Sequence, residues 1–133
     1  MTTPSTKESF IVTLPLPPSI LSPNRPTGSI GGRMRRAKAT ERYRKLARRA
    51  AEAEMVESGP WQKATVKAAF YHGVDRRRDD VNHNAMLKPA YDGVVDAGVL
   101  VDDDHKHLTT LPAEFRIDRD CPRVELLFER VDA

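Results

Sequence analysis

Residues 63–104 read KATVKAAFYHGVDRRRDDVNHNAMLKPAYDGVVDAGVLVDDD, and they decide the fold because a strand pattern gives way here to a helix pattern. In residues 63–71 apolar and polar side chains alternate, as they do in a strand with one buried face. In residues 83–97 apolar pairs recur every three to four positions, which predicts an amphipathic helix with Gly98 just beyond its end. The predicted inward face of the strand consists of Ala64, Val66, Ala68 and Phe70.

The flanking sequence repeats both patterns. Residues 10–14 form a short apolar and β-branched run, and residues 39–56 have apolar side chains at helical spacing, with Thr40 as a candidate N-cap. Residues 113–118 and 123–131 alternate as strands. Their predicted inward positions are Ala113, Phe115, Ile117, Val124, Leu126 and Phe128.

The order strand–helix–strand–helix–strand–strand indicates an α/β fold. We expect one mixed β-sheet with two main α-helices packed against it, in a single small domain over residues 1–133. Residues 15–38 are rich in Pro, Gly and Arg and have no apolar period, which predicts a long loop.

Charge is distributed unevenly along the chain. Residues 1–78 carry 16 Lys and Arg against 6 Asp and Glu, whereas residues 79–133 carry 6 against 13. This asymmetry favours a surface for a polyanion beside a carboxylate site. No apolar run approaches the roughly 20 residues of a membrane helix, so no membrane partner is expected. The single cysteine, Cys121, and an N-terminus without a signal-peptide pattern favour a reducing, cytoplasmic compartment.

Two carboxylate clusters flank the second predicted helix. Asp79 and Asp80 precede it, and the triplet at 102–104 follows it. Such oxygen ligands suit Mg²⁺, which can polarise a phosphoryl oxygen and activate water. Because a helix of about 15 residues spans roughly 22 Å, the clusters meet only if the chain folds back beyond Gly98 or if a partner subunit contributes.

Basic residues gather in two places. Residues 33–49 hold nine Lys and Arg and one acid, which is too one-sided for an ordinary mixed surface. Three arginines at 76–78 stand directly before the first acids, where they can hold flanking phosphates. The candidate DNA-binding residues are Arg33, Arg35, Arg36, Lys38, Arg42, Lys45, Arg49, Arg76, Arg77, Arg78 and Asn82.

The run RRRDDVNHNAMLKPAYDGVVDAGVLVDDD, at 76–104, resembles the signature of RusA-type Holliday junction resolvases. It has an Arg-rich stretch, an Asp-x-Asp-Asn-like element, a lysine that opens a helix, a Gly turn and an acidic cluster. The opening TLPLPPS, at 13–19, resembles the TLPxPPS opening of that family. The resemblance covers most of the chain and is weakest over 15–38 and the last strand. It implies a RusA-like homodimer that acts on four-way DNA junctions in a bacterial or phage-infected cytoplasm.

The resemblance also assigns roles by position. Asp79 matches the first acid of the Asp-x-Asp element, Asn82 its Asn, Lys88 the helix lysine and Asp103 the later catalytic acid. It implies that the acids bind Mg²⁺, which Mn²⁺ can replace, and that the lysine assists near the scissile phosphate. The expected catalytic residues are Asp79, Asp80, Lys88 and Asp103, and the expected metal ligands are Asp79, Asp80, Asp102 and Asp103.

The chain departs from the family pattern at Val81, where the family has its second Asp. In an extended segment Asp79 and residue 81 point one way and Asp80 the other. Either a local turn aims Asp80 at the metal, with Val81 packed inward, or the site has fewer ligands and Val81→Asp would add one. Lys88 has an open alternative as well, since it can pair with Asp92 at i,i+4 on a helix surface.

The expected function is therefore a Mg²⁺-dependent endodeoxyribonuclease that makes paired cuts in Holliday junctions during DNA recombination, repair or phage DNA processing, with no small-molecule substrate. Two alternatives stay open. One is a non-catalytic DNA-binding module of the same fold. The other is a Mg²⁺-dependent nuclease for other branched or single-stranded DNA.

Overall fold

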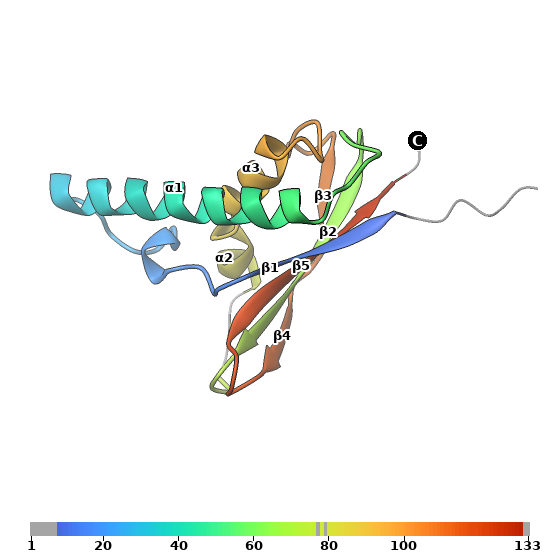
Figure 1. Ribbon diagram of the computed structural model, residues 1–133. Coiled ribbons are helices and arrows are strands. Elements are labelled where there is room, and N and C mark those ends of the chain that lie inside the picture. Colours follow the sequence, from blue (N-terminus) through green and yellow to red (C-terminus); the bar gives the residue numbers. More distant parts are fainter. Residues whose placement is uncertain (1–7, 77, 79, 132–133) are drawn as a thin grey trace, which may run out of the picture.

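The computed structural model describes residues 8–76, 78 and 80–131, and in it the helices cover one face of a five-stranded sheet (Figure 1). The order across the sheet is β1–β5–β2–β3. β4 pairs with the same edge of β2 as β3 does, farther along the strand. The predicted single α/β domain with a mixed sheet is confirmed. The strands are β1 (Ser9–Leu14), β2 (Ala64–His72), β3 (Leu108–Thr110), β4 (Glu114–Ile117) and β5 (Arg123–Arg130), and the helices are α1 (Ile30–Ala53), α2 (Asp80–Ala85) and α3 (Lys88–Asp96).

The central strand β2 organises the sheet. It runs antiparallel to β5 and parallel to both β3 and β4. Along β1, β2 and β5 every second residue is buried against the helices, as the alternation in the sequence predicts for β2 and β5. The predicted inward residues of β2 and β5, namely Ala64, Val66, Ala68, Phe70, Val124, Leu126 and Phe128, are all at most 2% exposed.

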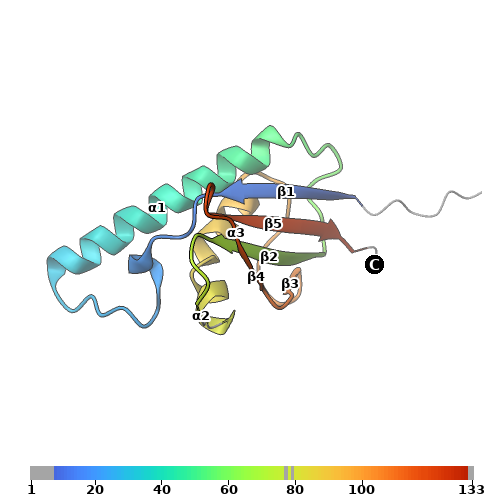
Figure 2. The ribbon, with the colours of Figure 1, turned by 90° about the horizontal axis from the view of Figure 1, so that it is seen from below.

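Helix α1 begins nine residues earlier than the sequence pattern predicts. The cap is Ser29, whose hydroxyl accepts a hydrogen bond from the Gly32 backbone N–H at 3.0 Å, so Thr40 is not the N-cap. Residues 30–38 are therefore helical, and the loop prediction holds only for the segment before them, which contains a short 3-10 turn at Ser19–Leu21. The first part of α1 projects past the sheet, so it has no apolar stripe to bury and gives no periodic signal (Figure 2).

The second predicted helix is two helices. Pro89 lacks an N–H and its ring clashes with a carbonyl four residues earlier, so α2 ends at Ala85 and Pro89 lies in the first turn of α3. Gly98 follows the end of α3 with φ of +81°, which confirms its predicted place just beyond the helix.

The edge of the sheet beside β2 is built from two short strands. β3 pairs with the start of β2 and β4 with its end, and the chain leaves the ladder between them around Pro112. No sequence pattern indicates β3, which is three residues long. The inward prediction for Ile117 is wrong, because this residue lies at the end of β4, beyond the cover of the helices, and is 49% exposed.

The two main helices meet at a glycine. Gly93 of α3 is buried against α1, and a Cβ there would lie within 2.9 Å of the Ala47 Cβ and would collide with the Arg44 carbonyl oxygen. Arg44 also binds Asp96, with Nε and Nη2 at 2.5 and 2.8 Å from the two carboxylate oxygens. Among the described residues, no helix is both long and apolar enough to cross a membrane.

We predict that Gly93→Ala lowers the free energy of unfolding by about 1–3 kcal/mol, because the new methyl group forces α1 and α3 apart. The loss appears although Ala is the better helix former. Urea denaturation measures it. Gly28→Ala is the matched control, since a Cβ at Gly28 meets nothing within 4 Å, and it should stay within about 0.5 kcal/mol of the wild type. Equal stability of the two variants would contradict the close packing at Gly93.

Candidate functional site

Lys88 and Asp103 lie fifteen residues apart in the sequence and touch in the structure. The Lys88 Nζ is 2.5 Å from Asp103 Oδ2 and 2.9 Å from Asp92 Oδ1. Lys88 stands at the start of α3 with Asp92 one turn later, whereas Asp103 comes from the loop that follows α3. The pairing of Lys88 with Asp92 and its approach to the predicted catalytic acid are therefore both present.

The fold-back beyond Gly98 makes this contact. After the turn at Gly98 the chain runs alongside Trp61. The Trp61 backbone N–H donates to the Val99 carbonyl at 2.6 Å, and the Val101 backbone N–H donates to the Trp61 carbonyl at 3.0 Å. Leu100 is 2% exposed, so this short extended piece is anchored in the core. This anchoring places the acidic triplet at 102–104 beside the start of α3.

Lys88 and Asp103 are both charged at neutral pH. Burial alone would raise the pKa of Asp103, whose side chain is 8% exposed. The hydrogen bond and charge of Lys88, together with hydrogen bonds involving Asp92 and Asp102, outweigh burial and hold this pKa below its ordinary value. Burial would lower the pKa of Lys88, and the hydrogen bonds to Asp103 and Asp92 raise it instead. In this arrangement Lys88 is a fixed positive charge and proton donor rather than a base.

Asp80 is bound into the fold. Its Oδ1 accepts hydrogen bonds from Asn84 Nδ2 at 2.9 Å and from the backbone N–H of Ala113 at 2.8 Å. The second bond satisfies an N–H that the break between β3 and β4 leaves without a ladder partner. Asp80 was predicted as a metal ligand, but its Oδ1 is thus engaged in hydrogen bonds that hold the fold together.

The expectation of an extended segment across 79–82 is wrong from Asp80 onward, because α2 begins there. Val81 is 77% exposed, so it does not pack inward as one of the two alternatives required. An acid at this position would face solvent and would not be buried without a partner.

Asn82 and Arg36 hold the segment between β1 and α1. The Ser22 hydroxyl donates to Asn82 Oδ1 at 3.1 Å, which ties this segment to α2. The Arg36 guanidinium donates to three backbone carbonyls of the same segment at 2.8–2.9 Å. Both were predicted to contact DNA. The sequence offered no signal for these loop contacts.

The exposed face of α1 carries cations without acidic partners. Lys45 pairs with Glu41 at 3.1 Å, and Arg44 is held by Asp96. Five others are exposed and make no ion pair with another described residue; we call them the α1 basic surface, consisting of Arg33, Arg35, Lys38, Arg42 and Arg49. Several cations without acidic partners on one helix are typical of phosphate-binding surfaces.

The remaining predicted residues lie apart from this helix or outside the described residues. Arg76 is exposed, and Arg78 Nη2 donates to the Val74 carbonyl at 2.9 Å. Asp79 and Arg77 lie outside the described residues. Asp102 accepts a hydrogen bond at Oδ1 from the Asp103 N–H at 2.7 Å.

Carboxylate oxygens of Asp80, Asp102 and Asp103 are the donor type that Mg²⁺ selects. Among residues 8–76, 78 and 80–131, however, no group of three or more Asp, Glu, His or Cys side chains is arranged to hold a metal ion. The described acids fit magnesium in kind but do not by themselves complete a site.

Two polar groups that sequence reasoning missed lie near Asp80. Asn84 Oδ1 and the Tyr91 hydroxyl are buried without a hydrogen-bond partner. Burial raises the pKa of Tyr91, and the charge of Asp80 raises it further, so Tyr91 stays neutral. Asp80, Asn84 and Tyr91 form a polar group beside the apolar core, and no spacing in the sequence identifies it.

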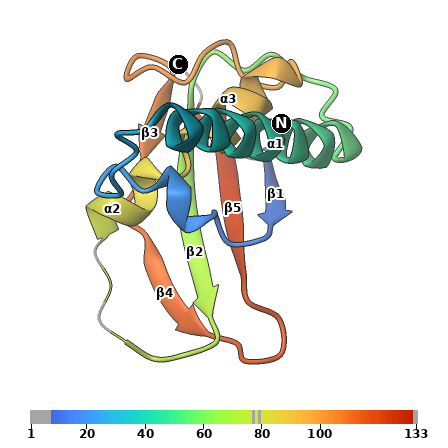
Figure 3. The same cartoon turned by 90° about the vertical axis from the view of Figure 1, so that its left-hand side faces the viewer.

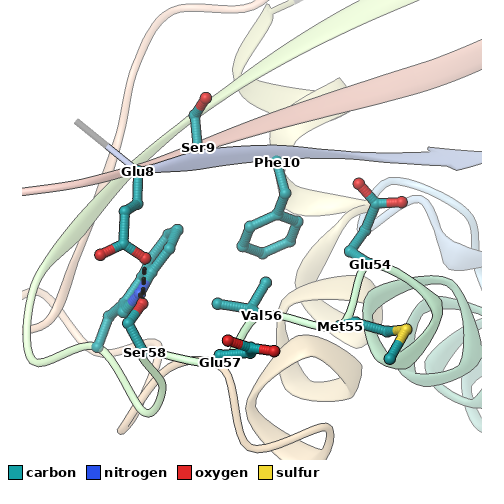
Figure 4. A pocket seen from close by; sticks show the side chains of 9 residues that line it. Glu8, Ser9, Phe10, Glu54, Met55, Val56, Glu57 and Ser58 are labelled. Carbon is teal, nitrogen blue, oxygen red and sulfur yellow. Dashed lines mark hydrogen bonds between the residues drawn. The ribbon is translucent and has the colours of Figure 1, made fainter. Parts of the chain in front are cut away.

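A separate cavity of about 540 Å³ lies between the start of β1 and the segment after α1 (Figure 4). It contains none of the predicted site residues. Of the three glutamates that line it, Glu8 accepts a hydrogen bond from Ser58 and pairs with Arg130 at 3.0 Å. Phe10 and Val56 supply its apolar wall.

Comparison with known proteins leaves the chain unplaced: no protein-family model matches it, and no curated protein matches it.

We predict that Lys88→Met raises the pKa of Asp103, because burial then acts without the opposing hydrogen bond and charge of the ammonium group. Asp103 stabilises the wild type at neutral pH, and this contribution is lost as the pH falls through its lowered pKa. The variant should lose it at higher pH. NMR titration of the Asp103 carboxyl carbon measures the shift. Lys106→Met, in the same loop, should leave it unchanged; an Asp103 pKa that stays low in Lys88→Met would refute the pairing.

Proposed function

We propose that the chain is a Mg²⁺-dependent endodeoxyribonuclease that cuts four-way DNA junctions, as its resemblance to RusA-type resolvases implies. The observation that carries the proposal is the contact of Lys88 with Asp103. These are two of the residues that the resemblance assigns to catalysis, and they meet although α3 and its following turn separate them in the sequence.

The chemistry of this pair suits phosphodiester hydrolysis. An ammonium group whose pKa is raised can neutralise charge that develops on a phosphoryl oxygen or on the leaving oxygen. Magnesium would supply further positive charge and a more acidic water. We propose Asp79 and Asp103 as its principal ligands, with Asp102 and Asp80 beside them, and Mn²⁺ as a substitute.

The position of the α1 basic surface supports DNA as the substrate. The Arg44–Asp96 ion pair and the close approach at Gly93 fix α1 across α3, the helix that carries Lys88 and Asp92. A duplex arm bound along α1 would have its backbone beside the acidic cluster without passing over the open face of the sheet. Arg76 and Arg78 lie on the segment that leads into α2 and would extend this contact.

Paired cuts require two sites. A homodimer with two-fold symmetry presents two equivalent sites to the two equivalent strands of a junction. We propose this assembly, in a RusA-like fold, for the cytoplasm of a bacterial or phage-infected cell.

Asp79→Asn and Asp103→Asn should each reduce cleavage of a synthetic mobile junction in Mg²⁺ by about 100-fold or more, because each removes a carboxylate from the reacting centre. Binding should persist, since loss of a negative charge favours the phosphates. Asp120→Asn, an exposed acid between β4 and β5, is the control. Asp80→Asn keeps an oxygen that accepts from Ala113, so loss of cleavage in a folded Asp80→Asn protein would assign Asp80 to the metal.

The same assay distinguishes the alternatives. Binding without any Mg²⁺-dependent cut would indicate a non-catalytic DNA-binding module and refute the nuclease. Equal cutting of flaps or single strands and of junctions would indicate a nuclease of broader specificity. Near wild-type cleavage by Asp103→Asn would remove that residue from the site.

Replacing Arg33, Lys38 and Arg42 by Gln, one at a time and then together, should weaken junction binding and flatten its dependence on salt. Each lost phosphate contact lowers the log–log slope by about 0.9. Fluorescence anisotropy over a range of salt concentrations measures the slope. Arg119→Gln makes the same charge change on an exposed residue distant from α1 and serves as the control. An unchanged slope in the triple variant would place the DNA surface elsewhere.

A further inference from the structure

A small cavity of about 90 Å³ lies where β2 and β4 end, and we call it the His72 pocket. These strand ends lie on the far side of α2 from α3 (Figure 3), so the pocket is separate from the Lys88–Asp103 pair. Its volume is that of about three water molecules, which suits one small ion and is too small for a nucleoside. Its lining consists of His72, Val74, Asp75, Arg76, Arg78, Phe115, Arg116 and Ile117.

The charge of the His72 pocket is predominantly positive. Arg76, Arg78 and Arg116 line it, and Asp75 is the acid among the lining residues. Arg116 binds Glu114 at 2.5 Å, but that carboxylate also binds Lys67 at 2.5 Å, so it is shared between two cations. Arg78 donates one N–H to the Val74 carbonyl and has further donors available.

His72, which lines the pocket, has a buried polar atom without a hydrogen-bond partner, Nε2. The imidazole is fixed by stacking beside Phe70 and Phe115, at centroid distances of 6.2 and 6.4 Å, and by an edge contact with His83 at 5.4 Å. A buried nitrogen of this kind calls for a bound group that satisfies it. Because the aromatic packing fixes the ring, the imidazole does not turn toward a partner elsewhere, and a bound group has to reach it.

The His72 ring is neutral at physiological pH. Burial, together with the positive charges of Arg78, His83 and Arg76, lowers its pKa to about 4. The groups that face it are His83 from α2, Asp75, Arg76 and Arg78 from the loop after β2, and Arg116 from β4. A cation would be repelled by the same arginines, whereas an anion would be attracted and would accept a hydrogen bond from the imidazole.

We propose that the His72 pocket binds a phosphate group through Arg76, Arg78, Arg116 and the His72 imidazole, and that this group is a backbone phosphate of bound DNA. Several guanidinium groups around one small cavity match the several oxygens of phosphate better than the two of a carboxylate. The choice of DNA as the source rests on the proposed function. On that basis the pocket holds the strand on the side of α2 opposite the Lys88–Asp103 pair.

The experiment follows the His72 imidazole by NMR, first with inorganic phosphate and then with a four-way junction, in a buffer without other polyvalent anions. An anion in the pocket neutralises the arginines and stabilises the protonated ring, so the His72 pKa should rise by about one unit or more. Inorganic phosphate should raise it at saturation, and the junction should raise it and then exclude free phosphate. Unchanged His72 titration with both probes would overturn the proposal.

Variants make the result specific. Arg76→Gln and Arg78→Gln should each weaken the phosphate effect on His72 several-fold, whereas Arg119→Gln, the same charge change outside the pocket, should not. His72→Phe keeps the aromatic packing and removes Nε2, so its junction affinity should fall while its spectrum stays that of a folded chain. Full phosphate response in both arginine variants would contradict the assignment of these residues.

The two proposals fail in different ways. If the wild-type chain does not cut junctions but its His72 responds to DNA, the proposed nuclease activity is wrong and the proposed phosphate pocket stands. If the wild-type chain cuts junctions, and His72→Phe and Arg78→Gln bind them with unchanged affinity and salt dependence, the nuclease activity stands and the phosphate pocket is wrong. A response to inorganic phosphate without one to DNA would overturn DNA as the source.

Discussion

The close contact between α1 and α3 at Gly93 is the constraint on which the remaining geometry depends. Without a side chain at this position the α3 backbone reaches the Arg44 carbonyl and Ala47, and the Arg44–Asp96 ion pair closes the same interface. Because α1 also packs on β1, the position of α3 over the sheet is fixed at the same time. The start of α3, with Lys88, therefore has a defined place relative to the basic helix.

Where a segment buries one face, its sequence pattern predicted whether it is a helix or a strand. The apolar run of β1, the alternation in β2 and β5 and the apolar pairs of α3 each reflect a face turned toward the core. Prediction failed where burial is slight: the projecting first part of α1 has little to bury, and β3 pairs over three residues. The apolar pairs of residues 83–97 continue past Ala85, so periodicity predicted one helix where Pro89 divides it into two.

The candidate site was predictable as a set of residue types but not as an arrangement. Gly98 indicated a turn, yet the delivery of Asp103 to Lys88 also depends on the backbone bonds to Trp61, which lies nearly forty positions earlier. The hydrogen bond from Ala113 to Asp80 joins a strand break to a helix start and has no local pattern at all. Long-range pairings of this kind follow from topology, which the spacing of motifs does not contain.

The divided edge of the sheet has a consequence for how copies of the chain meet. A continuous edge strand beside β2 would offer a row of free N–H and C=O groups on which another chain could add a strand. Here the edge consists of β3 and β4, three and four residues long, with Pro112 between them and with Glu114 and Arg116 on its outer part. The protein is thus protected, on this side of the sheet, against polymerising into fibres.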